Sequence, residues 1–503
     1  MRVLYRTIPP RGVPAIRAFL KISLLLLLAA SSACGRSGSG EGTLSVELSY
    51  PSAPAAGANT VVLPALASAA PADSAAAASY PTLPGNRILI RVLAPHFAPI
   101  EAWFDRSDGR GVIGSIPPGE RITVEVDEYD NTASTLGTAA PLLGRGWSRG
   151  ITLSRGEAKT VDVAMYAKGT IVTICGAPAS GGQGTSGDSG DGGLDNAALL
   201  GYPSAVKAGA GDSIYISSSA YGRVRRIDRY GYVSHFAGNG NSGTVAAGDA
   251  LSSAPIGFVS DIDVDPSGNL YLLTYYNQIV KAAGGVVSAV MYDNGTVNPA
   301  ARLNLAVVAE DLVFFVNSLD PRVYRIIGSA KSDYVTDGTP HDTVEPFDRF
   351  HYPISAPSGI VYEQESDSLV FADTANDRIM KLQLSNLNIF YQVADDAGGA
   401  SFTEGADPLA MAPVQPRVVE HNPFTGKIFF VEQGGNRVLH IDPSDKVRTF
   451  AGTGVLGFSG DGGPAAEARL NDPRAVTVDS RGNAYIADYG NHAIRMVVGG
   501  ALT

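Results

Sequence analysis

Apolar and polar residues alternate in short runs along most of this chain. Before residue 167 four such runs stand out, namely TLSVELSY at 43–50, RILIRVLA at 87–94, RITVEVDEY at 121–129 and KTVDVAMY at 159–166. A period of two places the apolar side chains on one face of a β-strand, and turns rich in Gly and Pro separate the runs. Residues 43–166 are therefore predicted to form a small antiparallel β-sandwich.

Beyond residue 169 the alternating runs repeat as a unit. Alignment on the second strand of each unit brings six positions into register, namely Tyr215, Tyr271, Phe314, Val370, Phe429 and Tyr485. Successive positions lie 43 to 59 residues apart, which leaves room for four short strands in a unit. Repeats of this length with four strands are typical of a β-propeller that has one unit per blade. We expect an all-β fold with six blades within residues 169–499.

The last unit, 474–498, contains only three of its four strands. The segment TIVTIC at 170–175 has the pattern of a fourth strand, but it precedes the first complete unit. Natural β-proteins avoid long unpaired strand edges, because such edges invite aggregation. We therefore expect 170–175 to pair with 494–498, so that an N-terminal strand completes the last blade and closes the ring.

The last unit and the loop before it read GFSGDGGPAAEARLNDPRAVTVDSRGNAYIADYGNHAIRMV at 457–497. This segment resembles the NHL repeat, in the form found in teneurin-like and many bacterial secreted proteins. The resemblance implies a β-propeller over residues 170–498, in which the middle repeats are more divergent. Separately, IPPGERITVEV at 116–126 resembles bacterial immunoglobulin-like or carboxypeptidase-regulatory-like modules, which implies an immunoglobulin-like β-sandwich before the propeller.

The chain of 503 residues begins with the features of an export signal. Five basic residues precede the apolar run 22–30, and small residues lead into Cys34. Because this run is too short to span a bilayer comfortably, residues 1–34 are expected to be a lipoprotein-type signal segment with Cys34 as the lipidated residue. Ordinary signal cleavage nearby is the alternative. The Gly/Ser-rich stretch 35–42 would then be a flexible tether, and the Ala/Pro/Ser-rich stretch 51–85 a mobile loop of the sandwich.

The charge of the chain excludes one class of partner. Without the five basic residues of the signal segment, 33 basic and 49 acidic residues leave a formal charge of about −16. Such a chain repels a phosphate backbone, so we expect no nucleic-acid partner. Cys175 is the only cysteine besides Cys34, so no internal disulfide is expected once Cys34 is lipidated or removed.

Candidate ligand-binding residues come from the first strand of each unit, because this strand lies nearest the axis of a propeller. The aligned positions include Lys207, Asp263 and Glu420, and charges beside a central channel can hold a ligand. Their mixed signs equally permit ion pairs among themselves. Two Gly/Asp loops, 187–193 and 457–463, could either ligate calcium or serve as turns. With no histidines at metal-ligand spacing and no nucleophile motif, we predict no catalytic residue, metal site or cofactor.

These features favour a non-enzymatic binding or scaffold protein of the bacterial cell envelope, attached to a membrane through its lipid. The long segments between units, 332–355 and 392–416, would present a surface to a protein or carbohydrate partner, although neutral insertion also explains their length. Six-bladed folds similar to this one include metal-dependent lyases and lactonase-type hydrolases with a site at the channel. An enzyme of that kind is the alternative function, and it needs several polar side chains that converge at one channel end.

Overall fold

The computed structural model describes residues 42–49, 87–105, 110–130, 141–176, 184–274, 278–292, 303–310, 312–317, 320–327, 354–384, 390–394, 415–423, 425–432, 434–441 and 446–499. These residues belong to one compact unit, Gly40–Thr503. The expected signal segment with Cys34, nearly all of the tether, and the loop 51–85 lie outside the described residues, as do most of 332–355 and 392–416. The described residues form β-strands and short 3₁₀ helices, and none of their helices is long and apolar enough to cross a membrane.

The first seven strands form one sheet, which we call the N-terminal sheet. Its strands are β1 (Gly42–Ser49), β2 (Arg87–Ala94), β3 (Phe97–Asp105), β4 (Arg110–Ile116), β5 (Gly119–Tyr129), β6 (Leu142–Leu153) and β7 (Ala158–Ala167). They lie in the order β3-β2-β5-β6-β7-β1-β4, with β1 parallel to β7. The four runs identified in the sequence are β1, β2, β5 and β7. Val92, Val124 and Val163 lie fully buried in the apolar core of this sheet, as their alternation predicts.

The remaining strands form six small sheets in the described part of the chain, which we call the repeat region. Its strands are β8 (Ile171–Cys175), β9 (Pro203–Gly209), β10 (Ser213–Ser218), β11 (Arg223–Ile227), β12 (Val233–Ala237), β13 (Asp261–Val264), β14 (Leu270–Leu273), β15 (Ile279–Ala283), β16 (Val286–Tyr292), β17 (Leu303–Ala309), β18 (Leu312–Asn317), β19 (Asp320–Ile327), β20 (Pro357–Glu363), β21 (Ser368–Asp373), β22 (Arg378–Gln383), β23 (Phe390–Ala394), β24 (Pro416–His421), β25 (Ile428–Glu432), β26 (Arg437–Ile441), β27 (Val447–Ala451), β28 (Pro473–Val478), β29 (Ala484–Asp488) and β30 (Ala493–Val497). Among the described strands, five sheets have four members and β17-β18-β19 has three. The positions aligned in the sequence all fall in the second strand of their sheets.

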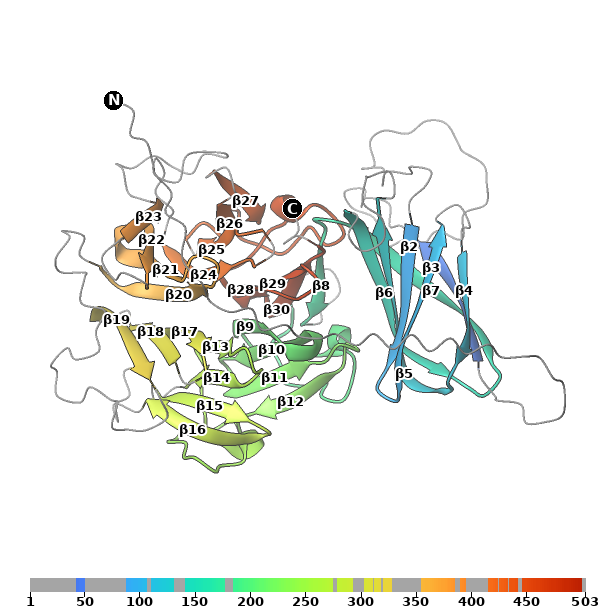
Figure 1. Ribbon diagram of the computed structural model, residues 1–503, viewed down its shortest axis with the longest axis horizontal. Helices are drawn as coiled ribbons and strands as arrows, with labels where there is room; N and C mark the ends of the chain where they lie inside the picture. The colour runs from blue at the N-terminus through green and yellow to red at the C-terminus, as the bar shows by residue number, and fades with distance from the viewer. Residues whose placement is uncertain are drawn as a thin grey trace, which may run out of the picture. The chain divides into compact units, whose positions relative to one another are not determined.

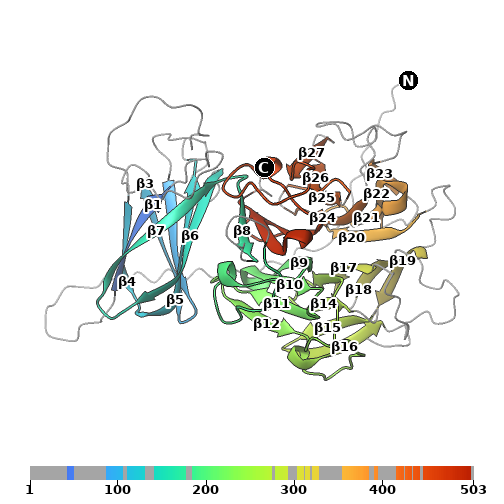
Figure 2. The ribbon, with the colours of Figure 1, turned by 180° about the vertical axis from the view of Figure 1, so that it is seen from behind.

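The last sheet is completed by a strand from the beginning of the repeat region. Its order is β28-β29-β30-β8, and Val172 of β8 stands opposite Met496 of β30. Figure 1 and Figure 2 show β8 beside β30 from opposite sides. The ladder extends past the end of β30, because the Val498 N–H donates to the Thr170 carbonyl at 2.9 Å. The pairing predicted for these two segments is therefore confirmed.

Strand β8 is buried on both of its faces, which explains why its sequence is apolar nearly throughout. Ile171 packs in a core cluster with Phe429 and Val431 of β25. On the opposite face Ile174 packs with Ile214 and Ile216 of β10. The side chains of this five-residue strand thus pack against the sheets on both sides of it.

The first strands of the six sheets contact one another in a closed sequence. Contacts join β9 to β13, β13 to β17, β17 to β20, β20 to β24, β24 to β28 and β28 back to β9. Apolar clusters fill the space between adjacent sheets, for example between β14 and β10 or between β21 and β25. Residues on the first strands therefore meet at the centre of the repeat region.

Candidate functional site

The three ligand-binding candidates from the sequence occupy equivalent places on the first strands. Each stands opposite an aligned residue of the second strand, in the pairs Lys207 with Tyr215, Asp263 with Tyr271, and Glu420 with Phe429. The third unit, for which no first-strand candidate was named from the sequence, contributes Ala306 opposite Phe314. Because the first and second strands pair in the same register in these sheets, the candidate side chains lie at the same height along the axis.

Lys207 joins the other two candidates. Its Nζ lies 3.0 Å from Asp263 Oδ1 and 3.2 Å from Glu420 Oε2. The side chains of Lys207, Asp263 and Glu420 are 19, 13 and 11 % exposed, so little water screens these pairs. Burial opposes the charge on Lys207, but the two carboxylates outweigh burial and raise its pKa. The sequence left open whether these charges hold a ligand or pair with one another. In the structure they form ion pairs with one another.

Neighbouring strands engage the remaining oxygens of these carboxylates. Glu420 Oε1 accepts a hydrogen bond from Thr477 Oγ1 at 3.1 Å, and Thr477 Oγ1 accepts the Ala208 N–H at 3.2 Å. Asp263 Oδ2 accepts the Val307 N–H at 2.7 Å. Each bond crosses from one sheet to the next. We call Lys207, Asp263, Glu420 and Thr477 the axial cluster, and its contacts link the sheets around the axis.

Asp261 lies beside the axial cluster, two residues before Asp263 on β13. Its Oδ2 accepts the Leu305 N–H at 2.9 Å. Burial raises the pKa of Asp261 to about 7, even though the Leu305 N–H favours the ionised form, and the nearby charge of Asp263 adds to the rise. Asp261 is thus an axial group that titrates near neutral pH.

The two Gly/Asp loops place their carboxylates on buried arginines. Asp191 lies 2.8 Å from Nη2 of Arg225, and Asp461 lies 2.9 Å from Nη2 of Arg495. Arg225 and Arg495 are 1 and 0 % exposed, so each requires a counter-charge. In the described residues, no three His, Cys, Asp or Glu side chains gather as a group that could hold a metal ion. Pairing with arginine therefore accounts for Asp191 and Asp461.

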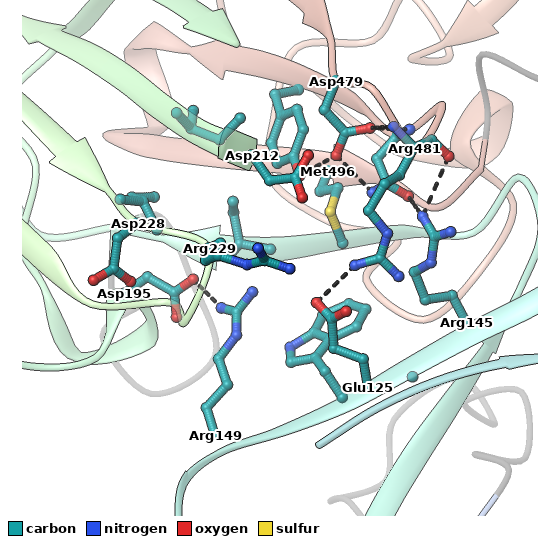
Figure 3. A pocket seen from close by; sticks show the side chains of 17 residues that line it. Glu125, Arg145, Arg149, Asp195, Asp212, Asp228, Arg229, Asp479, Arg481 and Met496 are labelled. Carbon is teal, nitrogen blue, oxygen red and sulfur yellow. Dashed lines mark hydrogen bonds and ion pairs between the residues drawn. The ribbon is translucent and has the colours of Figure 1, made fainter. Parts of the chain in front are cut away.

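A second polar site, which we call the interface pocket, lies between the N-terminal sheet and the repeat region (Figure 3). Its charged lining residues are Glu125, Arg145, Arg149, Asp195, Asp212, Asp228, Arg229, Asp479 and Arg481. Trp147 and Met496 add an apolar wall. The N-terminal sheet supplies residues through β5 and β6, whereas the repeat region supplies residues from its first and last sheets.

The turn between β28 and β29 holds Arg481 in this pocket. Asp479 Oδ1 accepts the N–H groups of Arg481 and Asn483 at 2.9 and 2.8 Å, which locks the turn DSRGN. In the second sheet Asp265 locks the turn DPSGN in the same way, with Ser267 at the place of Arg481. The last repeat therefore has Arg481 at the position where the second repeat has the small residue Ser267, and the backbone hydrogen bonds of the two turns are the same.

Arg481 and Arg145 connect the two regions. Arg481 Nη1 lies 2.6 Å from Glu125 Oε1. Arg145 Nε lies 2.5 Å from Asp127 Oδ1, while Arg145 Nη1 donates to Asn483 Oδ1 at 2.8 Å. Burial opposes ionisation of Asp127, but three neighbouring arginines outweigh burial and hold the pKa of this carboxyl well below its usual range. The interface is thus a buried charge network.

Sequence reasoning did not identify the interface pocket. Its residues come from segments more than 300 positions apart, as Arg145 and Asn483 show, and no local motif marks them. One signal was present: the turn of the last repeat carries Arg481 where the same turn in the second repeat carries Ser267. In this chain the cation that departs from the repeat pattern has a role outside the repeat, because Arg481 pairs with Glu125 of the N-terminal sheet.

The small antiparallel sheets, closed by contacts between their first strands, define a β-propeller protein. Residues 470–495 match the family model described as the NHL repeat. The segment 470–495, which contains β28, β29 and the first part of β30, thus matches the NHL repeat that its sequence resembles.

Solved structures with similar folds include three bacterial proteins. A structural genomics protein of unknown function from Bacteroides thetaiotaomicron VPI-5482 is 14 % identical with a TM-score of 0.50, and the match covers 81 % of this chain and 90 % of that chain. An auxiliary nutrient binding protein from Bacteroides ovatus ATCC 8483 is 14 % identical with a TM-score of 0.49, covering 82 and 94 %. A gluconolactonase from Xanthomonas campestris is 14 % identical with a TM-score of 0.40, covering 66 and 98 %. No curated protein matches the chain. At 14 % identity, the similarity to the first of these structures is evidence for the fold alone.

Proposed function

We propose that this chain is an exported, non-enzymatic binding or scaffold protein of the bacterial cell envelope. Its architecture in this proposal is a six-bladed propeller at 169–499 that follows an immunoglobulin-like sandwich at 43–166. The closed sequence of contacts from β9 through β28 supports six blades. The separate apolar core of the N-terminal sheet supports a distinct first module.

The observation that carries a binding role is a group of exposed apolar and aromatic side chains where the first and last sheets meet. Tyr202, Val455 and Leu456 are 40, 53 and 60 % exposed. The ring of Tyr202 lies 5.0 Å from that of Tyr489 and 4.2 Å from that of His492. We call these five residues the seam surface.

Further contacts tie the seam surface together. Asn491, next to His492, donates to the Gly457 carbonyl at 2.8 Å, directly after Leu456. The guanidinium of Arg474 stacks on Tyr489 with 3.2 Å between its Cζ and the ring centre. Tyrosine, arginine and exposed aliphatic side chains are the residues that protein interfaces bury at their centres. A protein partner therefore fits this surface better than a carbohydrate.

The alternative function is a metal-dependent lyase or lactonase-type hydrolase with its site at the propeller channel. An enzyme of this class requires polar groups at the channel that are free to contact substrate or metal. Lys207, Asp263 and Glu420 bind one another instead, which supports a structural role at the axis. Metal analysis of the purified protein with and without chelator tests this point. Stoichiometric calcium or zinc that survives dialysis would favour the enzyme.

Affinity capture tests the binding role. The mature protein is used as bait for envelope extract, beside the double variant Tyr202→Ala/Leu456→Ser and the control Val286→Ser, which removes an apolar residue that is 43 % exposed outside the seam surface. We expect one partner that wild type and control retain equally and that the double variant loses about tenfold or more. Recovery of no specific partner, or equal recovery by all three proteins, would reject the proposal. Retention of a glycan in a parallel array would assign the carbohydrate class.

Membrane attachment through Cys34 is part of the same proposal. The basic residues, apolar run and small residues that precede Cys34 support it. Cells are labelled with a fatty-acid probe and the wild type is compared with Cys34→Ala. We expect label in the wild type only, and label in neither protein would point to ordinary signal cleavage.

A further inference from the structure

Two arginines of the interface pocket have buried Nε atoms with no hydrogen-bond partner among the described residues. They are Arg149 on β6 and Arg229 in the turn after β11. Figure 3 shows both guanidinium groups pointing into the pocket. Arginine carries five donors and no acceptor, so each free donor requires an oxygen or another acceptor.

Backbone geometry shows that Arg149 reaches across to the turn that holds Arg229. A Cβ atom built on Gly231 would lie 2.3 Å from Arg149 Cδ and 2.5 Å from its Nε. Only a glycine leaves room there, and Gly231 also has a φ of +83°. On its other side, Arg149 Nη1 forms an ion pair with Asp195. The Cδ and Nε atoms of Arg149 thus lie directly over the turn that contains Gly231.

Arg229 has neither an ion pair nor a hydrogen bond within the part of the chain that the structure describes. Its recorded contact is with the Tyr230 ring, at 5.9 Å from Cζ to the ring centre. Two acids of the same pocket each have one oxygen engaged elsewhere: Asp228 Oδ1 accepts the N–H groups of Tyr230 and Tyr232 at 2.9 Å each, and Asp212 Oδ1 accepts the Ser480 hydroxyl at 2.6 Å. A buried charged donor without an acceptor is more costly than a neutral one, and two guanidinium groups repel each other.

An anion between the two arginines would relieve both costs. The planar guanidinium matches the oxygens of a carboxylate or a phosphate. Glu125, Asp195, Asp212, Asp228 and Asp479 line the same pocket, and their repulsion is about twice as large for a dianion as for a monoanion. The surrounding carboxylates therefore favour a ligand with a single negative charge.

The pocket is small, about 50 Å³, and part of its wall is apolar, so the remainder of such a ligand is limited to a few atoms. Trp147 and Met496 line the pocket together with Ile214 and Ile227. Pockets for small organic molecules combine an apolar wall with a few oriented polar groups. An inorganic anion would leave this wall unused, whereas the hydrocarbon part of an organic acid can contact it.

We propose that the interface pocket binds a small organic monocarboxylate, with its carboxylate between Arg149 and Arg229 and its apolar part against Trp147. Arg149 belongs to the N-terminal sheet and Arg229 to the repeat region, so the ligand contacts both. The interface pocket is separate from the seam surface. A failure to find the proposed protein partner would therefore not affect this proposal.

Tryptophan fluorescence provides a direct readout, because the chain has two tryptophans, Trp103 and Trp147, and only Trp147 lines the pocket. Titration of the mature protein carrying Trp103→Phe uses sodium acetate and sodium propionate, which match the small volume of the pocket. Sodium chloride and phosphate at equal ionic strength are the comparison titrations. We expect a saturable change with the carboxylates that chloride and phosphate do not produce, and a carboxylate-dependent rise in Tm.

Two arginine variants make the test specific. Arg229→Gln keeps a polar, unbranched side chain but removes the charge and the guanidinium group, and we expect carboxylate binding to weaken about tenfold or more. Arg226→Gln is the matched control, since Arg226 lies three positions earlier, also has a buried Nε without a partner, and does not line the pocket. The control is expected to bind as the wild type does. If Arg229→Gln does not fold, Arg229→Lys retains the charge without the fork and should bind with intermediate affinity.

Three results would overturn this proposal. The first is the lack of a saturable response to any of the carboxylates. The second is equal binding by wild type and Arg229→Gln. The third is a response to phosphate alone, which would assign the pocket to an inorganic dianion.

Discussion

The Nδ1 atom of His492 accepts a hydrogen bond from the backbone N–H of Tyr202 at 3.2 Å, and this bond joins the last sheet of the repeat region to the first. The same contact joins two other pairs of consecutive sheets, through Asn436 with Asp472 at 3.1 Å and Asp377 with Gln415 at 2.8 Å. All six residues have positive φ values between 49 and 54°. We call this contact the latch. It connects a left-handed turn of one sheet to the residue that precedes proline in the next.

The latch at His492 should make stability depend on pH. Nδ1 accepts a hydrogen bond only while the imidazole is neutral, and burial lowers the pKa of His492 below its ordinary value. Protonation therefore favours the unfolded chain, so the contribution of the latch is complete above about pH 6.5 and is lost as the pH falls through the folded pKa. We expect His492→Asn, which copies Asn436, to lose stability less steeply than wild type between pH 7 and 5, by about 1 kcal/mol. Urea unfolding at several pH values measures this, and parallel curves for the two proteins would contradict it.

Removal of the axial lysine should destabilise the fold strongly. Lys207→Met leaves Asp263 and Glu420 close together and largely buried without a counter-charge, at an expected cost of about 3–5 kcal/mol in the free energy of unfolding. Lys159→Met is the control, because Lys159 only donates to the Thr152 carbonyl in an exposed place and should cost less than about 1 kcal/mol. Similar unfolding midpoints for the two variants would show that the axial cluster contributes little.

Asp261 should produce a pH dependence of the opposite sign. Its pKa of about 7 in the folded state lies above the usual aspartate value of about 4, so the folded chain holds a proton that the unfolded chain has lost. The contribution of Asp261 to stability therefore falls as the pH rises from about 4 to about 7 and is constant above that range. Asp261→Asn should remove this slope. Titration of the Asp261 carboxyl by NMR provides an independent check, and a midpoint near 4 would refute the assignment.

Because β8 closes the last sheet, shortening a buried side chain of β8 should lower the free energy of unfolding. Ile171 is fully buried beside Phe429 and Val431, so Ile171→Ala should cost about 2–5 kcal/mol. Thr173→Ala on the same strand removes an exposed hydroxyl that donates to Asp461, and about 1 kcal/mol is expected. Denaturant unfolding monitored by circular dichroism measures both. A cost for Ile171→Ala no larger than that for Thr173→Ala would contradict the two-sided packing of β8.

Cys175 should be chemically inert in the folded protein. Burial raises the pKa of its thiol to about 12, and the thiolate is the reactive form. A thiol reagent at pH 8 should therefore label Cys175 only after denaturant is added. Rapid labelling of the native protein, measured by mass spectrometry, would mean that β8 opens readily.

In the repeat region the sequence was sufficient to align the second strands, whereas in the N-terminal sheet it identified four of the seven described strands. Val370 and Phe429 were aligned from turn residues and alternation alone, and each stands opposite a first-strand residue, Val361 and Glu420. Both signals are local, because side-chain direction in a strand alternates strictly and turn residues have individual backbone preferences. The third unit was the exception: its turn is degenerate in sequence, and Ala306 emerged only from the pairing of β17 with β18.

The sequence by itself therefore determined the alternating strands, the repeat and the need for a strand to close the last sheet, since each follows from neighbours along the chain. Only the tertiary structure decided what the charges do. The sequence put Lys207, Asp263 and Glu420 at one aligned position of the first strands, but whether they pair with one another depends on distances between sheets. Arg149 and Arg229 line one pocket because the N-terminal sheet contacts the repeat region. Charge interactions act through space over a few ångströms, so their partners are fixed by packing and not by spacing along the sequence.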